Sequence, residues 1–243
     1  MKFKKLIEIG KELFPINRSL TGDGNFKTLK AIKKQVPKLK IKKFKCGKKV
    51  YDWKIPDEWN VKSAHIKDGR NKKIVDFKNN NLHLVGYSSP VQKFVKKSEL
   101  IKHLHSIKNM PNSIPYITSY YNKYWGFCLT HRQKLNLIKR YKSQDKFLVN
   151  INSRFNKSGK MHYGELVLPG ISKSEILIST YICHPSMANN ELSGPLVSIA
   201  LINFFKKVKL EKTIRFIFIP ETIGSIAYIN KNLKNLKKRI FGG

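Results

Sequence analysis

Two short polar stretches in the last quarter of the chain contain residues that can do chemistry. His184 begins the stretch HPSMANNELSG, which also carries Asn190 and Glu191, and Glu221 follows a proline in the stretch IPETIG. Imidazole nitrogen and carboxylate oxygen are ligands that zinc takes in proteins, and a carboxylate can also act as a general base. These residue types fit metal or acid–base chemistry, provided that the fold brings the two stretches together.

The segments around these stretches predict one β-α-β unit. Residues 175–181 and 213–219 have the length and the apolar content of buried strands, and residues 195–209 between them show apolar residues at helical spacing. A further helix is expected at about residues 226–238. The two strands of such a unit run parallel, and the polar loops at their carboxyl ends meet at one edge of the sheet. We therefore expect His184 and Glu221 to emerge at the same edge.

The stretches HPSMANNELSG and IPETIGSIAY resemble an aminopeptidase-like family found beside polysaccharide-biosynthesis genes. This family, DUF4910 with an inserted DUF2172 domain, is a distant branch of the M28-type co-catalytic zinc aminopeptidases. The front of the chain resembles the small inserted domain at residues 53–56, 81–83, 86–88, 114–116, 119–121 and 125–128. The resemblance therefore covers essentially the whole chain.

The resemblance implies a site for one or two zinc ions and a peptide-like or amide-bearing substrate. His184 matches a zinc ligand, and Glu221 matches the general base that takes a proton from the attacking water and passes it to the leaving amine. Asn190 stands where the aminopeptidases have a metal-bridging aspartate, and Thr222 stands where they have a glutamate ligand. Both are departures, because neither an amide nor a hydroxyl brings negative charge to a metal ion. Glu191 could replace the bridging carboxylate if the loop is rearranged.

Each of these residues also has a structural interpretation. Alone, His184 would be a hydrogen-bonded histidine, and Asn189 and Asn190 would cap the helix that follows. Glu221 would be a carboxylate stabilised by a helix dipole, or a metal ligand itself. Cys183 is expected to be buried and to point away from His184, because neighbouring residues of a strand face opposite sides.

Three residues are expected to contact substrate. Arg18 lies in a turn-rich link that, in the family, is near the rim of the active site, although an ordinary surface arginine explains it as well. Tyr120 and Tyr121 belong to a group of aromatic residues that could line a cleft between two domains, or could instead form the core of a β domain.

The expected fold class is α/β, with a mixed, largely parallel sheet covered by helices on both faces and a small, mostly β inserted domain. Short β-like pieces separated by Asp, Asn, Gly and Pro turns place the inserted domain at residues 48–129. Residues 1–47 and 130–243 then form the α/β domain. Within it, residues 147–153 and 161–168 are predicted to be the two strands of a hairpin.

Composition limits the class of protein further. The chain has 243 residues and a formal net charge of +34, from 49 Lys and Arg against 15 Asp and Glu. Because these lysines are spread along the chain without a recognisable nucleic-acid module, no specific nucleic-acid partner is expected. Three cysteines without paired spacing favour a reducing, cytoplasmic compartment, and no apolar run is long enough to span a membrane.

Two hypotheses remain for the function. The first is a zinc-dependent, aminopeptidase-like hydrolase linked to surface polysaccharide biosynthesis. The second is a catalytically degenerate or truncated homologue that acts as a binding module, because family members continue through another strand that brings further acidic and histidine ligands. Binding of nucleic acid through net charge ranks last.

Overall fold

The computed structural model describes residues 3–243, which divide into two compact units. Of the described residues, unit 1 comprises 3–58 and 156–243, and unit 2 comprises 59–155. The borders thus lie further along the chain than the predicted borders of the inserted domain, at 48 and 129. The reason is local pairing: the β2–β3 hairpin stays with unit 1, whereas helix α4 and most of strand β9 belong to unit 2.

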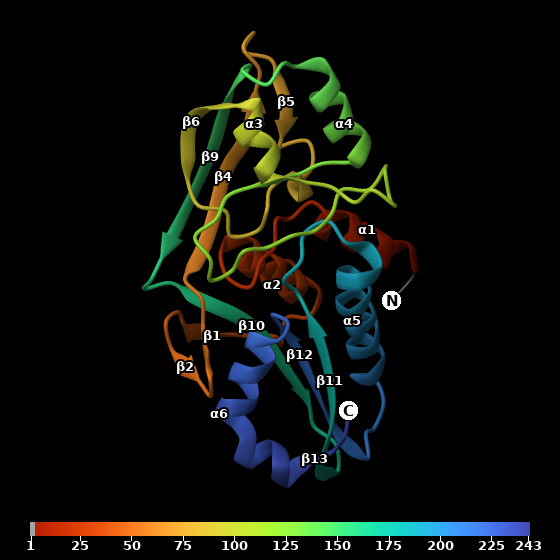
Figure 1. The fold of residues 1–243 in the computed structure, drawn as a ribbon. Coiled ribbons are helices and arrows are strands. Elements are labelled where there is room, and N and C mark those ends of the chain that lie inside the picture. Colours follow the sequence, from red (N-terminus) through yellow and green to blue (C-terminus); the bar gives the residue numbers. More distant parts are fainter. Residues whose placement is uncertain (1–2) are drawn as a thin grey trace. The chain divides into compact units, whose positions relative to one another are not determined.

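Unit 1 is a mixed five-stranded sheet with helices on both faces, as the sequence predicts (Figure 1). Its elements are α1 (Phe3–Leu13), α2 (Asp23–Gln35), β1 (Lys40–Lys45), β2 (Lys49–Val50), β3 (Trp53–Lys54), β10 (Lys160–Leu168), β11 (Ser172–Tyr181), the π-helical turn η3 (Ala188–Leu192), α5 (Ser193–Phe205), β12 (Lys212–Ile219), α6 (Ile223–Arg239) and β13 (Ile240–Gly242).

The strand order of this sheet is β1-β10-β12-β11-β13. Strands β11, β12 and β13 run parallel, so the β-α-β unit inferred from the sequence is confirmed. Strand β10 pairs antiparallel with β1 on one side and with β12 on the other, so parallel and antiparallel pairs are equally frequent in this sheet. The predicted hairpin of residues 147–168 is wrong, because β10 pairs with β1 and β12 whereas β9 pairs with β6.

Successive side chains of β10 and β12 point alternately to the two faces of the sheet. On one face, Leu166, Phe216 and Phe218 pack in an apolar core with buried residues of α1, α2 and α5. On the other face, Glu165 and Arg215 form a charged cluster with Tyr228 of α6. Helices α5 and α6 therefore cover opposite faces of the sheet (Figure 1).

Unit 2 is built around a four-stranded sheet of order β5-β4-β9-β6. Its elements are β4 (Glu58–Lys67), β5 (Lys73–Asp76), the 3-10 turn η1 (Asn81–His83), β6 (Val91–Lys96), α3 (Lys97–Leu100), the 3-10 turn η2 (Ile101–His103), β7 (Leu104–His105), β8 (Phe127–Cys128), α4 (His131–Arg140) and β9 (Lys146–Asn156). Helix α4 begins with a capping box, in which Thr130 and Gln133 each bond the other's backbone. Strands β4 and β9 have 10 and 11 residues, and the other strands of unit 2 are short.

Candidate functional site

The site forms where β11 and β12 end. The last paired residues are Tyr181 of β11 and Ile219 of β12, and the chain leaves both strands in the same direction because they are parallel. His184 follows the first strand by three residues and Glu221 follows the second by two. The Nε2 atom of His184 lies 3.3 Å from Oε2 of Glu221, so the predicted convergence of the two residues at one edge is confirmed.

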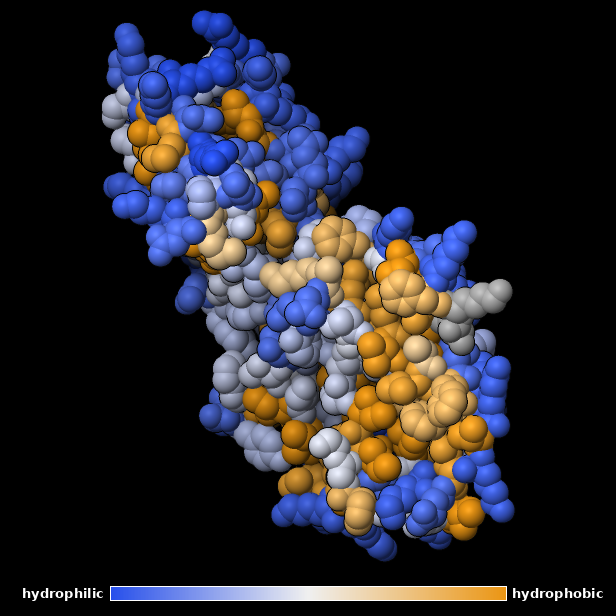
Figure 2. Space-filling model, turned by 90° about the vertical axis from the view of Figure 1, so that its right-hand side faces the viewer, coloured by the Kyte–Doolittle hydropathy of each residue, from blue (hydrophilic) through white to orange (hydrophobic). Residues whose placement is uncertain are grey.

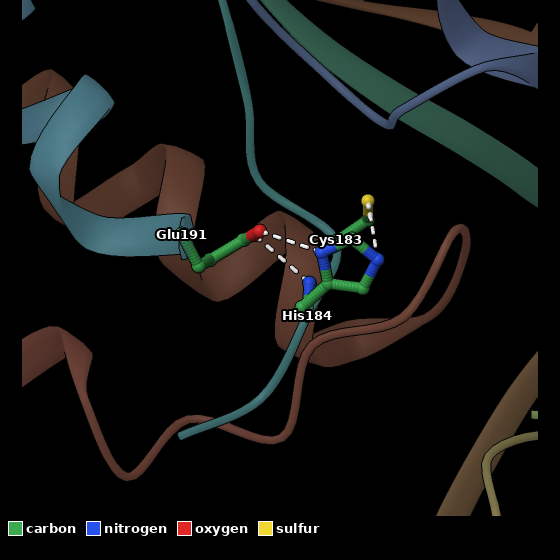
Figure 3. A group of neighbouring side chains, drawn as sticks. All are labelled: Cys183, His184 and Glu191. Carbon is green, nitrogen blue, oxygen red and sulfur yellow. Dashed lines mark hydrogen bonds and ion pairs between the residues drawn. The ribbon is translucent and has the colours of Figure 1, made fainter. Parts of the chain in front are cut away.

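Glu191 holds the other side of the His184 ring. Its Oε2 lies 3.0 Å from Nδ1 of the imidazole, and its Oε1 accepts a hydrogen bond of 2.9 Å from the His184 backbone N–H (Figure 3). A carboxylate accepts and cannot donate, so Nδ1 is the donor in this contact. Glu191 therefore orients His184 toward Glu221.

The π-helical turn η3 explains how Glu191 reaches inward. A π turn adds one residue to the ordinary helical turn, and such turns are frequent at functional sites. Asn189 and Asn190 within this turn are exposed, whereas Glu191 is only 1% exposed. Of the Asn-Asn-Glu triplet, only the glutamate thus faces the interior.

Arg18 supports the same cluster from the link between α1 and α2. Its Nε donates to the His184 carbonyl at 2.9 Å and lies 3.6 Å from Oε1 of Glu191, and its NH1 donates to the Leu13 carbonyl. Arg18 is 1% exposed, so its predicted position at the surface is wrong. Burial lowers the pKa of this guanidinium, and the nearby Glu191 charge acts in the opposite direction. These contacts position His184 and Glu191, and the substrate contact predicted for Arg18 stays a prediction.

Cys183 lies beside His184, contrary to the expected opposite orientation. Strand β11 has already ended at Tyr181, so the alternation of a strand no longer applies, and Sγ of Cys183 lies 3.9 Å from Nε2 of His184. The expected burial is confirmed, at 1% exposure. Burial raises the pKa of this thiol well above its ordinary value, and the Glu191 charge adds to the effect. The thiol is therefore neutral and accepts a hydrogen bond from the Glu221 backbone N–H.

Cys183, His184 and Glu191 are close enough together to suggest a metal-binding group (Figure 3). Both Glu191 oxygens, however, are already engaged by His184, one of them at Nδ1. The other ring nitrogen, Nε2, faces the Glu221 carboxylate. We therefore assign Glu191 to the support of His184, and His184 with Glu221 to the position where an ion would bind.

The other predicted site residues lie outside this cluster of contacts. The Asn190 side chain is exposed and donates to the Tyr181 hydroxyl at 3.3 Å. Thr222 is exposed as well and precedes α6 with a φ of 53°, a left-handed conformation that is strained for a β-branched residue. Tyr120 and Tyr121 are part of unit 2, where the Tyr120 ring packs edge-on against Tyr87. The substrate and metal roles predicted for these four residues stay predictions.

Sequence reasoning missed the support that Glu191 and Arg18 give to His184. The signal for Glu191 was an acidic residue in a loop beside a histidine, but its inward orientation depends on the π turn. Arg18 is 166 residues away from its His184 partner, so no local pattern indicates the contact. Its only signal was an arginine in a turn-rich segment.

The fold and the site together define an aminopeptidase-like α/β protein. The zinc aminopeptidase BSAP from Bacillus subtilis has the same fold, with a TM-score of 0.61 at 14% identity over 98% of this chain and 67% of that one. The chain belongs to the family described as a domain of unknown function, DUF4910, whose profile matches residues 7–243.

Two similar proteins come from Clostridium acetobutylicum. One, described as a candidate polysaccharide biosynthesis protein with an aminopeptidase-like domain, is 44% identical over 229 residues, which are 93% of this chain and 51% of that protein. The other is a crystal structure of a candidate peptidase, with a TM-score of 0.91 and 41% identity over 98% of this chain and 55% of that one. This chain thus spans about half the length of these relatives.

Proposed function

We propose that this chain carries part of a zinc-dependent site for the hydrolysis of peptide or amide bonds, with His184 Nε2 and the Glu221 carboxylate as zinc ligands. One observation supports the proposal above all others, the 3.3 Å separation of those two donor atoms. Two ligands that bind one zinc ion tetrahedrally with bonds of about 2.0–2.1 Å lie about 3.3 Å apart. The separation is therefore the one that a shared ion requires.

The surroundings of His184 fit the same role. Histidine ligands of zinc almost always donate their second ring N–H to a carboxylate or carbonyl, and Glu191 is placed to accept it at Nδ1. His184 is 7% exposed and the Glu221 side chain is 48% exposed, so one ligand is fixed and the other is open to solvent and substrate. When bound, zinc supplies Lewis-acid polarisation of a carbonyl and lowers the pKa of water.

Glu221 has a second possible role, as the alternative to binding zinc: a carboxylate that stays off the metal and transfers the proton. It lies on the exposed side of the site, within reach of an incoming substrate, whereas Glu191 is buried and engaged with His184. A carboxylate in this position can take the proton from the attacking water and pass it to the leaving amine. Tyr120 and Tyr121 remain proposed substrate contacts.

A second function is favoured by the small number of charged donors at the site. Catalytic zinc sites usually have three protein ligands, and among residues 3–243 only His184 and Glu221 take up this arrangement. Asn190 and Thr222 are neutral and exposed. The alternative is therefore a homologue that has lost the metal and binds its ligand without hydrolysis.

The names of the relatives support the wider setting of the proposal. A peptidase and a polysaccharide biosynthesis protein with an aminopeptidase-like domain suggest a peptide-like or amide-bearing substrate in surface polysaccharide assembly. Three buried free cysteines support a reducing, cytoplasmic compartment. No helix within residues 3–243 is long and apolar enough to cross a membrane.

Zinc titration of the purified chain by isothermal calorimetry tests the proposal. We expect binding of zinc that His184→Ala and Glu221→Gln each weaken by at least about tenfold. Glu211→Gln is the matched control, because this carboxylate is 84% exposed and outside the site. Zinc binding that neither site variant weakens would exclude this ligand pair. Absence of zinc binding would contradict the hydrolase proposal and support the alternative, a homologue that binds its ligand without metal.

A further inference from the structure

A hollow on unit 2 is lined by aromatic rings and by polar side chains. It has a volume of about 450 Å³ and lies beside the start of β6. Tyr124 and Trp125 provide the rings, and Ser89, Gln92, Lys93 and Lys123 provide polar groups. Pockets that combine an apolar wall with a few polar groups are the usual form of a small-molecule site.

The Trp125 ring is held rigidly from one side. The His103 imidazole stacks on it with ring centroids 3.7 Å apart and planes 14° from parallel. The His103 ring is fixed in turn by a contact of 2.8 Å between Nδ1 and the Trp125 carbonyl oxygen. Because His103 covers one face of the indole, a ligand can stack only on the opposite face, and Lys93 also places its Nζ over this ring, 5.8 Å from the centroid.

The Tyr124 ring is held as firmly. Its hydroxyl lies 2.8 Å from Nε2 of His105, and its carbonyl accepts a hydrogen bond of 2.7 Å from the Ser89 backbone N–H. A Cβ atom at Gly126 would come within 2.9 Å of the Tyr124 ring, so a glycine at this position makes room for it. Two aromatic rings are thus fixed in advance, which lowers the entropy cost of binding to them.

The charge around the hollow is modest, despite the net charge of the whole chain. Lys93 places its Nζ 5.8 Å from the centroid of the Trp125 ring and pairs with Glu99 at 2.8 Å, so its charge is largely balanced. Lys123 is then the other cation of the lining. A strand of nucleic acid needs a basic groove that follows several phosphates, and this hollow does not offer one.

We propose that the Tyr124–Trp125 hollow binds a pyranose ring of a saccharide. A pyranose has an apolar face of C–H groups, which stacks on the indole face opposite His103 once the exposed Lys93 side chain moves aside, and an edge of hydroxyl groups, which pair with serine, glutamine and lysine side chains. The hollow has room for a mono- or disaccharide. The site contains neither His184 nor Glu221, so it goes beyond the proposed hydrolase function, and either proposal can fail without the other.

Saturation-transfer-difference NMR on the full chain tests the saccharide site. The probes are methyl glucoside, N-acetylglucosamine and glucuronate, with a short oligothymidylate as competitor. We expect saturation transfer to the C–H protons of at least one sugar and no displacement by the oligonucleotide. Absence of transfer to all three sugars, or their displacement by oligothymidylate, would overturn the proposal.

Substitutions assign the signal to the hollow. We expect Trp125→Ala to weaken sugar binding about tenfold, and Trp125→Phe to keep part of it. Phe94→Ala is the matched control, because Phe94 is a 66% exposed aromatic residue of β6 that does not line the hollow. If Trp125→Ala fails to fold, Gln92→Ala, an exposed rim substitution, is expected to weaken the signal instead. An equal loss in Phe94→Ala would contradict the proposal.

Discussion

At the scale of single residues, the candidate site depends on a chain of buried contacts behind one histidine. Arg18 contacts Glu191 and the His184 carbonyl, and Glu191 contacts both the ring and the backbone of His184. The sequence identified His184 and Glu221, because both follow recognisable strands. It could not identify the support, because Glu191 needs the π turn and Arg18 needs a contact across the fold.

Glu191→Gln separates this positioning role from simple packing. The one amide oxygen is needed by the His184 backbone N–H, so the NH₂ group faces Nδ1 and cannot accept a hydrogen bond there. We therefore expect the His184 proton to move to Nε2 and zinc affinity to fall by about 10–100-fold. The stability should fall by about 3 kcal/mol, because Arg18 loses its buried carboxylate. Two-dimensional ¹⁵N NMR of the histidine ring reports the tautomer, and calorimetry reports zinc binding.

The matched control for this substitution is Glu12→Gln, an exposed carboxylate of α1. It should change neither the tautomer nor the stability. A Glu191→Gln protein that is less stable but keeps its proton on Nδ1 would show that Glu191 acts in packing alone.

At the scale of secondary structure, the sequence predicted the β-α-β unit that carries the site. Residues 175–181 and 213–219 are largely apolar, and they form parallel strands as expected. The π turn was not predicted, because a one-residue insertion in a helix leaves no periodic signal.

Close packing of α5 against β11 makes Gly194 a sensitive position. A Cβ atom there would lie 2.0 Å from Oγ1 and 3.1 Å from Cβ of Thr180. We expect Gly194→Ala to destabilise the protein by about 1–3 kcal/mol in urea unfolding. Thr180→Ala should recover part of that loss in the double variant, because it removes the clashing hydroxyl.

Gly69→Ala is the control for the glycine substitution, since a Cβ atom at Gly69 meets nothing within 4 Å. Its unfolding midpoint should match that of the parent. Equal effects of the two substitutions would mean that the contact with Thr180 is not the cause.

The charged cluster beneath α6 predicts a loss of stability in acid. Burial would raise the pKa of Glu165, but hydrogen bonds from Lys42 and Tyr228 outweigh burial and lower it. The pKa of Glu175 is lowered in the same way, with Arg215 and Arg239 outweighing burial. A carboxylate with a lowered folded pKa stabilises the protein above its unfolded value, about 4.3, and this contribution disappears as pH falls through the folded pKa.

Urea unfolding between pH 7 and pH 3 measures this effect. We expect the free energy of unfolding of the parent to decrease below about pH 5. Glu165→Gln should be less stable at pH 7 and should show a smaller decrease in acid. Parallel pH curves for the two proteins would rule out Glu165 as a contributor.

At the scale of the whole molecule, excess positive charge acts on every part of the chain. The net charge is +34, so the positively charged side chains repel one another. Salt weakens this repulsion between charges that lie further apart than the Debye length, which is about 8 Å at 0.15 M ionic strength. Hydrophobic side chains also gather on the surface of α1 and α5, as Figure 2 shows, including the exposed Ile7, Val197 and Phe204. The composition gives the net charge, but it does not indicate which apolar residues are exposed on the surface.

The charge leads to a prediction about salt. We expect the thermal midpoint of unfolding to rise by several degrees when sodium chloride increases from about 0.02 M to about 0.3 M, because screening weakens the self-repulsion of the folded state. Differential scanning calorimetry checks it. A midpoint that falls with salt would show that ion pairs outweigh repulsion.

The path of the chain through the two units has a consequence for synthesis on the ribosome. Unit 2 is continuous in sequence, whereas the sheet of unit 1 joins β1 to β10, so that Lys40 pairs with Glu165 across the whole insertion. Domains generally fold as units while the chain emerges. The inserted unit can therefore complete its folding first, whereas helices α1 and α2 must wait, exposed or bound by a chaperone, until β10 and the segments after it are translated.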